Sequence, residues 1–167
     1  MKKLMLFILV SMILGLSACS SAEGKELAEY HNNYVETVNE KATQVEVELN
    51  ASFEAGTLEE ELKLQEENVL PLISEIEEYI ESQKPESDVV KEMHSMRLEQ
   101  MRSWVEVFNL RFEALEKTIE GASEEEVAEI VQQAEEKVVE TQTKAQAANE
   151  KMAELADEYN VELIDEE

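Results

Sequence analysis

The two histidines of the chain are the first residues that could bind a transition metal. His31 and His94 each follow a glutamate, Glu29 or Glu92, by two positions. Imidazole and carboxylate are common metal ligands. Di-iron bundles, however, use Glu-x-x-His, which places both ligands a turn apart on one helix face. Glu-x-His points the pair in different directions, so a metal site at His31 and His94 is the secondary hypothesis. The alternative for His94 is a hydrogen-bonded residue at the edge of the core.

Forty Asp and Glu residues could also attract cations. The sequence contains no Asp-x-Asp-x-Asp-Gly loop of the EF-hand kind. The glutamate runs at 59–61 and 124–126 suit the first turn of a helix, where carboxylates interact favourably with the helix dipole. We therefore expect only weak, diffuse association with divalent cations.

A third group lies in "MHSMRLEQMRSWVEVFNLRFEAL", residues 93–115, which holds all three arginines and the only tryptophan. Arg97, Trp104 and Arg111 are seven residues apart and so follow one stripe of a helix. Arg and Trp are enriched at the energetic centres of protein interfaces. The stripe is a candidate partner-binding surface. Alternatively, the arginines pair with glutamates of neighbouring helices and Trp104 covers the edge of the core.

Familiar catalytic patterns are absent from the sequence. It has no Gly-rich phosphate loop, no Ser-His-Asp or Cys-His arrangement and no CxxC. We expect a protein that is not an enzyme and needs no cofactor.

The only cysteine, Cys19, follows a short basic start and an apolar run from Leu4 to Leu14. This run of eleven residues is too short to span a bilayer as a helix, and the pattern is typical of a secretory signal peptide over residues 1–18. A lone exported cysteine cannot form an internal disulfide.

Leu16-Ser17-Ala18-Cys19 resembles the lipobox of bacterial lipoproteins. The resemblance implies that a diacylglycerol is attached to the Cys19 thiol and that the chain is cut before this residue. It also implies a protein on the extracytoplasmic face of the cell membrane, in a Gram-positive or a Gram-negative envelope. Residues 19–24 would form a short tether, so the folded part must lie close to the membrane.

Charge restricts the partners of the mature chain. Removing residues 1–18 takes away two lysines, so the formal net charge goes from −26 to −28. Such a surface repels nucleic acid and anionic lipid heads. An apolar content of 43% nevertheless argues for a folded domain.

Apolar residues recur with helical spacing over four segments, at about 25–53, 58–82, 88–119 and 124–159. Gly24, Gly56 and Gly121 lie between or before them. Pro71 must kink or split the second segment, because it lacks an N–H and crowds the preceding turn. The third segment has a seam of large residues at a 4-3 spacing: His94, Leu98, Met101, Val105, Phe108, Phe112, Leu115 and Ile119.

The fourth segment has small residues at its middle seam positions, so we expect it to pair antiparallel with the third. Short loops then predict one all-α domain over residues 25–167, an up-down-up-down four-helix bundle. An elongated three-helix bundle or a coiled coil is the alternative. In the four-helix arrangement both histidines should lie at one level near the membrane.

Lipobox and helical composition together are similar to those of the cell-wall-binding lipoproteins of Gram-positive bacteria. The predicted function is a lipid-anchored, non-catalytic helical module that binds a protein or another envelope partner, and no nucleic acid. The alternative is a cation-binding or metal-binding envelope lipoprotein.

Overall fold

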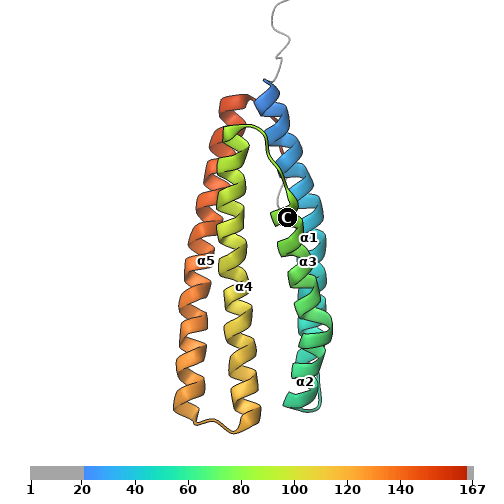
Figure 1. The fold of residues 1–167 in the computed structure, drawn as a ribbon, viewed down its shortest axis with the longest axis vertical. Helices are drawn as coiled ribbons and strands as arrows, with labels where there is room; N and C mark the ends of the chain where they lie inside the picture. The colour runs from blue at the N-terminus through green and yellow to red at the C-terminus, as the bar shows by residue number, and fades with distance from the viewer. Residues whose placement is uncertain (1–20, 165–167) are drawn as a thin grey trace, which may run out of the picture.

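The computed structural model describes residues 21–164, which form an all-α four-helix bundle without strands (Figure 1). Cys19 and the predicted signal peptide lie outside the described residues. The helices run up-down-up-down, as predicted, and in chain order they are α1 (Ala22–Phe53), α2 (Leu58–Leu64), the π-helix η1 (Gln65–Val69), α3 (Leu70–Ser82), α4 (Asp88–Glu120) and α5 (Glu124–Tyr159).

Hydroxyl side chains cap four of these helices at their first turn. The side-chain oxygens of Thr57 and Ser123 accept the backbone N–H of the residue three positions later. Ser21 and Ser87 do the same for α1 and α4. Each cap satisfies a backbone N–H that has no partner within the first turn of its helix.

The start of α1 corrects the predicted tether. We expected residues 19–24 to precede the first helix, but α1 begins at Ala22, and Gly24 is a buried residue inside it. A Cβ atom at Gly24 would lie 3.2 Å from Tyr159 Cβ and 3.2 Å from Val161 Cγ1. Glycine is therefore needed for close packing of α1 against the end of α5, and not as a helix boundary.

Pro71 is accommodated without splitting the helix. The chain stays helical from Leu58 to Ser82, and the five residues of η1 lie just before the proline. The N–H of Leu70 bonds to the carbonyl of Gln65, one residue further back than in an α-helix. A widened turn of this kind makes room for a ring that would clash with a regular α-helical turn.

The core has two clusters. The larger joins α1, η1, α3 and α4, and it includes Tyr34, Ile73, Ile76 and Met101. The second lies where α1 and α4 begin and α5 ends, which we call the N-terminal end, and it includes Leu27, Met93 and Met152. We call the opposite end, with loops 54–57 and 121–123, the far end. Within residues 21–164 no helix is long and apolar enough to cross a membrane.

The pairing of α4 with α5 agrees with the prediction, and theirs is the most extensive contact between helices (Figure 1). The predicted seam of α4 is displaced, however. Of its residues only Met101 is fully buried, whereas Ser103, Val107 and Ala114 are buried without having been assigned to it. The cause is that α4 has neighbours on two sides. Leu98, Val105 and Phe108 pack against the larger cluster, while Ser103 bonds to Thr141 of α5. The sequence did not predict this second buried side of α4, which faces α5.

Candidate functional site

The two histidines lie at the same end of the bundle but serve different contacts. His31 is 4% exposed, and its Nε2 is 2.9 Å from the carbonyl oxygen of Ile164. His94 is half-buried, and its Nδ1 lies 3.4 Å from the hydroxyl of Tyr30. Burial and the charge of Lys84 lower the pKa of His94 below its ordinary value. Each histidine therefore contributes to the packing of the N-terminal end.

The metal hypothesis gains no support from this arrangement. Within residues 21–164 there is no group of three or more His, Cys, Asp or Glu side chains placed to hold a metal ion. The predicted site at His31 and His94 has no third ligand among the described residues.

Arg97 is an interior residue. It is 1% exposed, and its guanidinium carbon lies 4.6 Å from the ring centroid of Tyr34. Its Nη1 donates to Oε1 of Gln100 at 3.0 Å. The expectation of an exposed stripe is therefore wrong for Arg97, because this side chain lies beneath the surface and stabilises the packing of α4 on α1.

Trp104 and Arg111 remain accessible and lie further along α4. Trp104 is half-buried and meets Phe108 edge to face, with ring centroids 4.5 Å apart. Arg111 is exposed. Both side chains line cavities in the far half of the bundle. Two of the three predicted residues thus belong to one surface.

That surface is hollowed by two adjoining cavities, which we call the far-end groove. The first, of about 300 Å³, lies between α4 and the wall formed by α1, α2, η1 and α3. The second, of about 270 Å³, lies between α4 and α5. Phe108 and Arg111 line both, so the two cavities adjoin along α4. The first is lined mainly by apolar side chains, among them Leu49, Phe53, Val69, Leu70, Phe112 and Leu115.

Phe53 is the most exposed large side chain of this lining, with 58% of its surface accessible. It stands at the last position of α1, where helix packing ends. The sequence predicted position 53 as the end of the first helical segment but did not indicate the groove. No local sequence pattern indicates the groove, because its walls come from segments distant in the chain.

Carboxylates are abundant in the segments that contain or flank the groove's lining residues. Segments 49–70 and 106–131, which we call the rim, contain fourteen Glu residues against only Lys63, Arg111 and Lys117. Lys117 is paired with Glu120 at 2.9 Å. The far end therefore combines an apolar hollow with a strongly negative rim.

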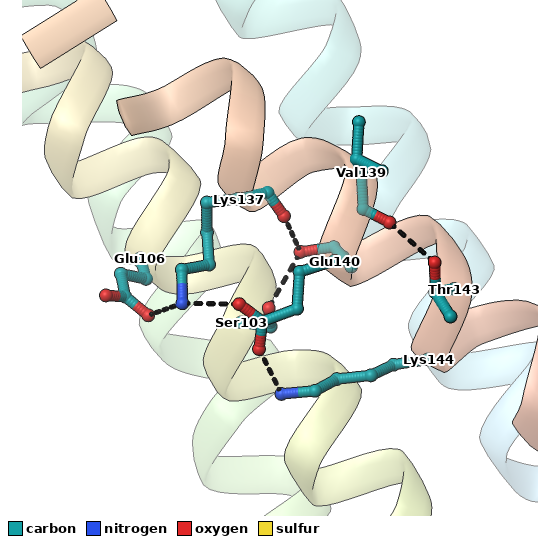
Figure 2. Close-up of polar contacts among 8 residues, drawn as sticks. Ser103, Glu106, Lys137, Val139, Glu140, Thr143 and Lys144 are labelled. Atoms are coloured by element: carbon teal, nitrogen blue, oxygen red, sulfur yellow. Dashed lines mark hydrogen bonds and ion pairs between the residues drawn. The ribbon is translucent and has the colours of Figure 1, made fainter. Parts of the chain in front are cut away.

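A polar network fixes α5 against α4 beside the second cavity (Figure 2). Lys137 Nζ lies 2.9 Å from a carboxylate oxygen of Glu106 and 2.6 Å from one of Glu140. Hydrogen bonds from Lys137 and Lys144 lower the pKa of Glu140 to about 2. These ion pairs are partly solvent-exposed and add little stability; the pair of Lys137 with Glu106 joins α5 to α4.

A hydroxyl pair lies within the same network. The Thr141 hydroxyl is 2.9 Å from Ser103 Oγ and donates to the carbonyl of Lys137. Thr141 also lines the second cavity, so this side of the groove is held in place from both helices.

Comparison of the chain with protein-family models, with curated proteins and with solved structures found no match. The class of protein is therefore given by the fold, an all-α four-helix bundle, and its site by the geometry of the far-end groove. The described cavities present apolar and aromatic side chains with a few polar groups, an arrangement suited to binding.

Proposed function

We propose that the protein is a lipid-anchored, non-catalytic module that binds a protein partner on the outer face of the cell membrane. The anchor is the diacylglycerol that the lipobox resemblance implies at Cys19. Only Ser20 and Ser21 separate Cys19 from α1. The N-terminal end of the bundle would therefore lie against the membrane.

One observation carries the binding role, namely the position of the far-end groove at the end of α1 that is remote from Cys19. At 1.5 Å per residue, the 32 residues of α1 extend over about 48 Å. An apolar hollow at that distance is accessible to a protein outside the membrane. Exposed apolar hollows with aromatic anchors are typical of protein-binding surfaces.

The proposal is tested by photo-crosslinking in cells that express the protein. A photoreactive residue at Phe53 should capture one protein, and the same residue at Val47 should not. Val47 is the matched control, since it lies on the same helix and is 60% exposed but does not line the groove. The same capture from both positions, or none from Phe53, would contradict a partner at the groove.

The anchor has a separate test. Cys19→Ser should release the chain from the membrane fraction and leave the helical circular dichroism of the bundle unchanged. A Cys19→Ser chain that stays in the membrane fraction would contradict the lipid anchor.

A further inference from the structure

The far-end groove is elongated along α4. Trp104, Phe108 and Phe112 follow one another at four-residue intervals on α4, and they line its two cavities in turn. From Trp104 to Leu115 this row is about 17 Å long at 1.5 Å per residue. Three turns of a second helix have nearly the same length. An elongated apolar row of this kind suits an amphipathic helix, which inserts side chains at i, i+3 or i+4, and i+7.

The walls of the groove support an elongated ligand. Phe53 and Leu49 stand on the α1 side, and Val138 stands on the α5 side. Polar side chains in the lining include Glu61 in one cavity and Gln142 in the other. A helix lying along α4 would therefore meet apolar side chains below it and polar groups beside it.

The charge of the rim decides the chemistry of the ligand. Glu61 lines the first cavity, and the surrounding segments contain fourteen carboxylates against three cationic side chains. A second copy of this chain would bring the same charge to the same place, and an anionic lipid would also be repelled. A cationic ligand is attracted.

We infer that the far-end groove binds an amphipathic helix whose polar face is rich in Lys and Arg. The inference rests on the proposed function and specifies its partner. The apolar face of the bound helix covers Phe53, Phe108 and Phe112, and its cationic residues meet the glutamates of the rim. Complementarity of this kind speeds association and selects the partner more than it adds affinity.

Trp104 makes the test specific, because it is the only tryptophan of the chain and lines the groove. The full chain is placed in nanodiscs of neutral phosphatidylcholine and titrated with synthetic peptides that lack Trp and Tyr. The first peptide is a Leu- and Lys-containing amphipathic helix. The second has Glu in place of every Lys, and the third has the first peptide's composition in a scrambled order without an apolar face.

The first peptide should bind, as measured by calorimetry, and should shift the Trp104 emission to the blue. Raising the salt concentration should weaken this binding, because screening reduces the attraction to the rim. The second and third peptides should bind at least about tenfold more weakly, a factor that corresponds to about 1.4 kcal/mol.

Phe53→Ser should weaken binding of the first peptide by a similar factor, whereas Val47→Ser should leave the affinity for this peptide unchanged. Both side chains are more than half exposed, so neither change should unfold the bundle, which circular dichroism verifies.

Several results would overturn the inference. Equal binding of the Glu peptide would show that rim charge does not select the ligand. Equal binding of the scrambled peptide, or binding that Phe53→Ser leaves unchanged, would show attraction to the acidic surface alone. Self-association lost on Phe53→Ser would assign the groove to a second copy. If Phe53 captures one protein in cells but the Lys peptide does not bind, only the cationic ligand fails; if neither occurs, the proposed function fails too.

Discussion

The two ends of the bundle are built from the same long helices but are closed to different degrees. At the N-terminal end Leu27, Val90, Met93 and Ala148 are all 0% exposed. At the far end Phe53 keeps 58% of its surface exposed. The comparison teaches that helix pairing alone does not close a four-helix bundle, because the closed end depends on extra segments that the open end lacks.

Two such segments close the N-terminal end. Residues 160–164 turn back after α5, and there Val161 and Leu163 pack on the second cluster. The Ile164 N–H donates to Asn32 at 3.2 Å. On the other side, the carboxylate of Glu26 accepts the N–H groups of Glu86 and Ser87 in the loop before α4.

The far end has no comparable cover within residues 21–164. The part of its wall formed by α2 and η1 has only two buried residues, Gln65 and Val69. Two polar contacts join it to α1: Gln65 Nε2 donates to Ser52 Oγ at 3.2 Å, and Asn68 Nδ2 donates to Glu48 at 3.0 Å. Few buried side chains hold this part of the wall, so the groove beside it stays open.

The largest expected effect is the loss of stability when a buried side chain is shortened at the closed, N-terminal end. Leu27→Ala should lower the free energy of unfolding by about 2–5 kcal/mol, because it removes a fully buried side chain. The same change at half-buried Leu115 of the groove should cost only about 1 kcal/mol. Urea unfolding followed by circular dichroism measures both, and equal losses would contradict the difference between the ends.

The second prediction separates the two histidines. His31→Ala removes a buried side chain and its hydrogen bond to Ile164, and should cost about 1–3 kcal/mol. His94→Ala should cost less, since His94 is half-buried and its contact with Tyr30 is long. If the two variants unfold at the same urea concentration, residues 160–164 do not stabilise the N-terminal end.

A glycine in the far-end loop gives the next effect. Gly121 has φ +79°, a conformation that costs other residues about 1–2 kcal/mol. Gly121→Ala should lower the free energy of unfolding by that amount. Gly56→Ala, in the other loop of this end, should be nearly neutral, because the added Cβ would meet only Glu60 Oε2 at 3.6 Å. Thermal melting compares the two variants, and a Gly56→Ala loss as large as that of Gly121→Ala would show that backbone conformation is not the cause.

The smallest expected effect is the loss of stability at low pH when Glu26 becomes protonated. Burial raises its pKa, but hydrogen bonds from Glu86 and Ser87 and the charge of Lys91 outweigh this, so the pKa is lowered from 4.5. A lowered pKa means that the contact stabilises the fold above about pH 4.5 and that this stabilisation is lost as the pH falls through the folded-state value. Glu26→Gln should lower stability by roughly 0.5–1.5 kcal/mol at pH 7.

The difference from the natural protein should then shrink below pH 4. Urea unfolding at pH 7 and pH 3.5 tests this, and Glu29→Gln, at an exposed position of the same helix, serves as the control for charge removal. A difference that stays constant between the two pH values would contradict the role of the ionised Glu26.

Much of the fold could be predicted because helical periodicity and capping are local properties. The four helical segments depend on residues close in sequence, and the pairing of α4 with α5 follows from the short loop between them. Burial depends on how many neighbours a helix has. For that reason the seam of α4 was displaced, and Arg97 was placed on the surface although it lies inside.

The candidate site was predicted only in part. The spacing of Trp104 and Arg111 indicated the right face of α4, since residues seven apart lie on one side of a helix. The groove itself arises from separation between α4 and the wall formed by α1 and η1. That separation is set by the sizes of side chains distant in sequence, so no local pattern could show it.

The unbroken course of α1 has a mechanical consequence. A single helix of 32 residues carries Leu49 and Phe53 at one extremity and begins three residues after Cys19 at the other. An α-helix without proline or an internal glycine beyond its first turn does not bend freely. Under the proposed function, tension between the lipid and a bound partner would therefore pass along one stiff rod, and the number of residues in α1 would fix the partner's height above the bilayer.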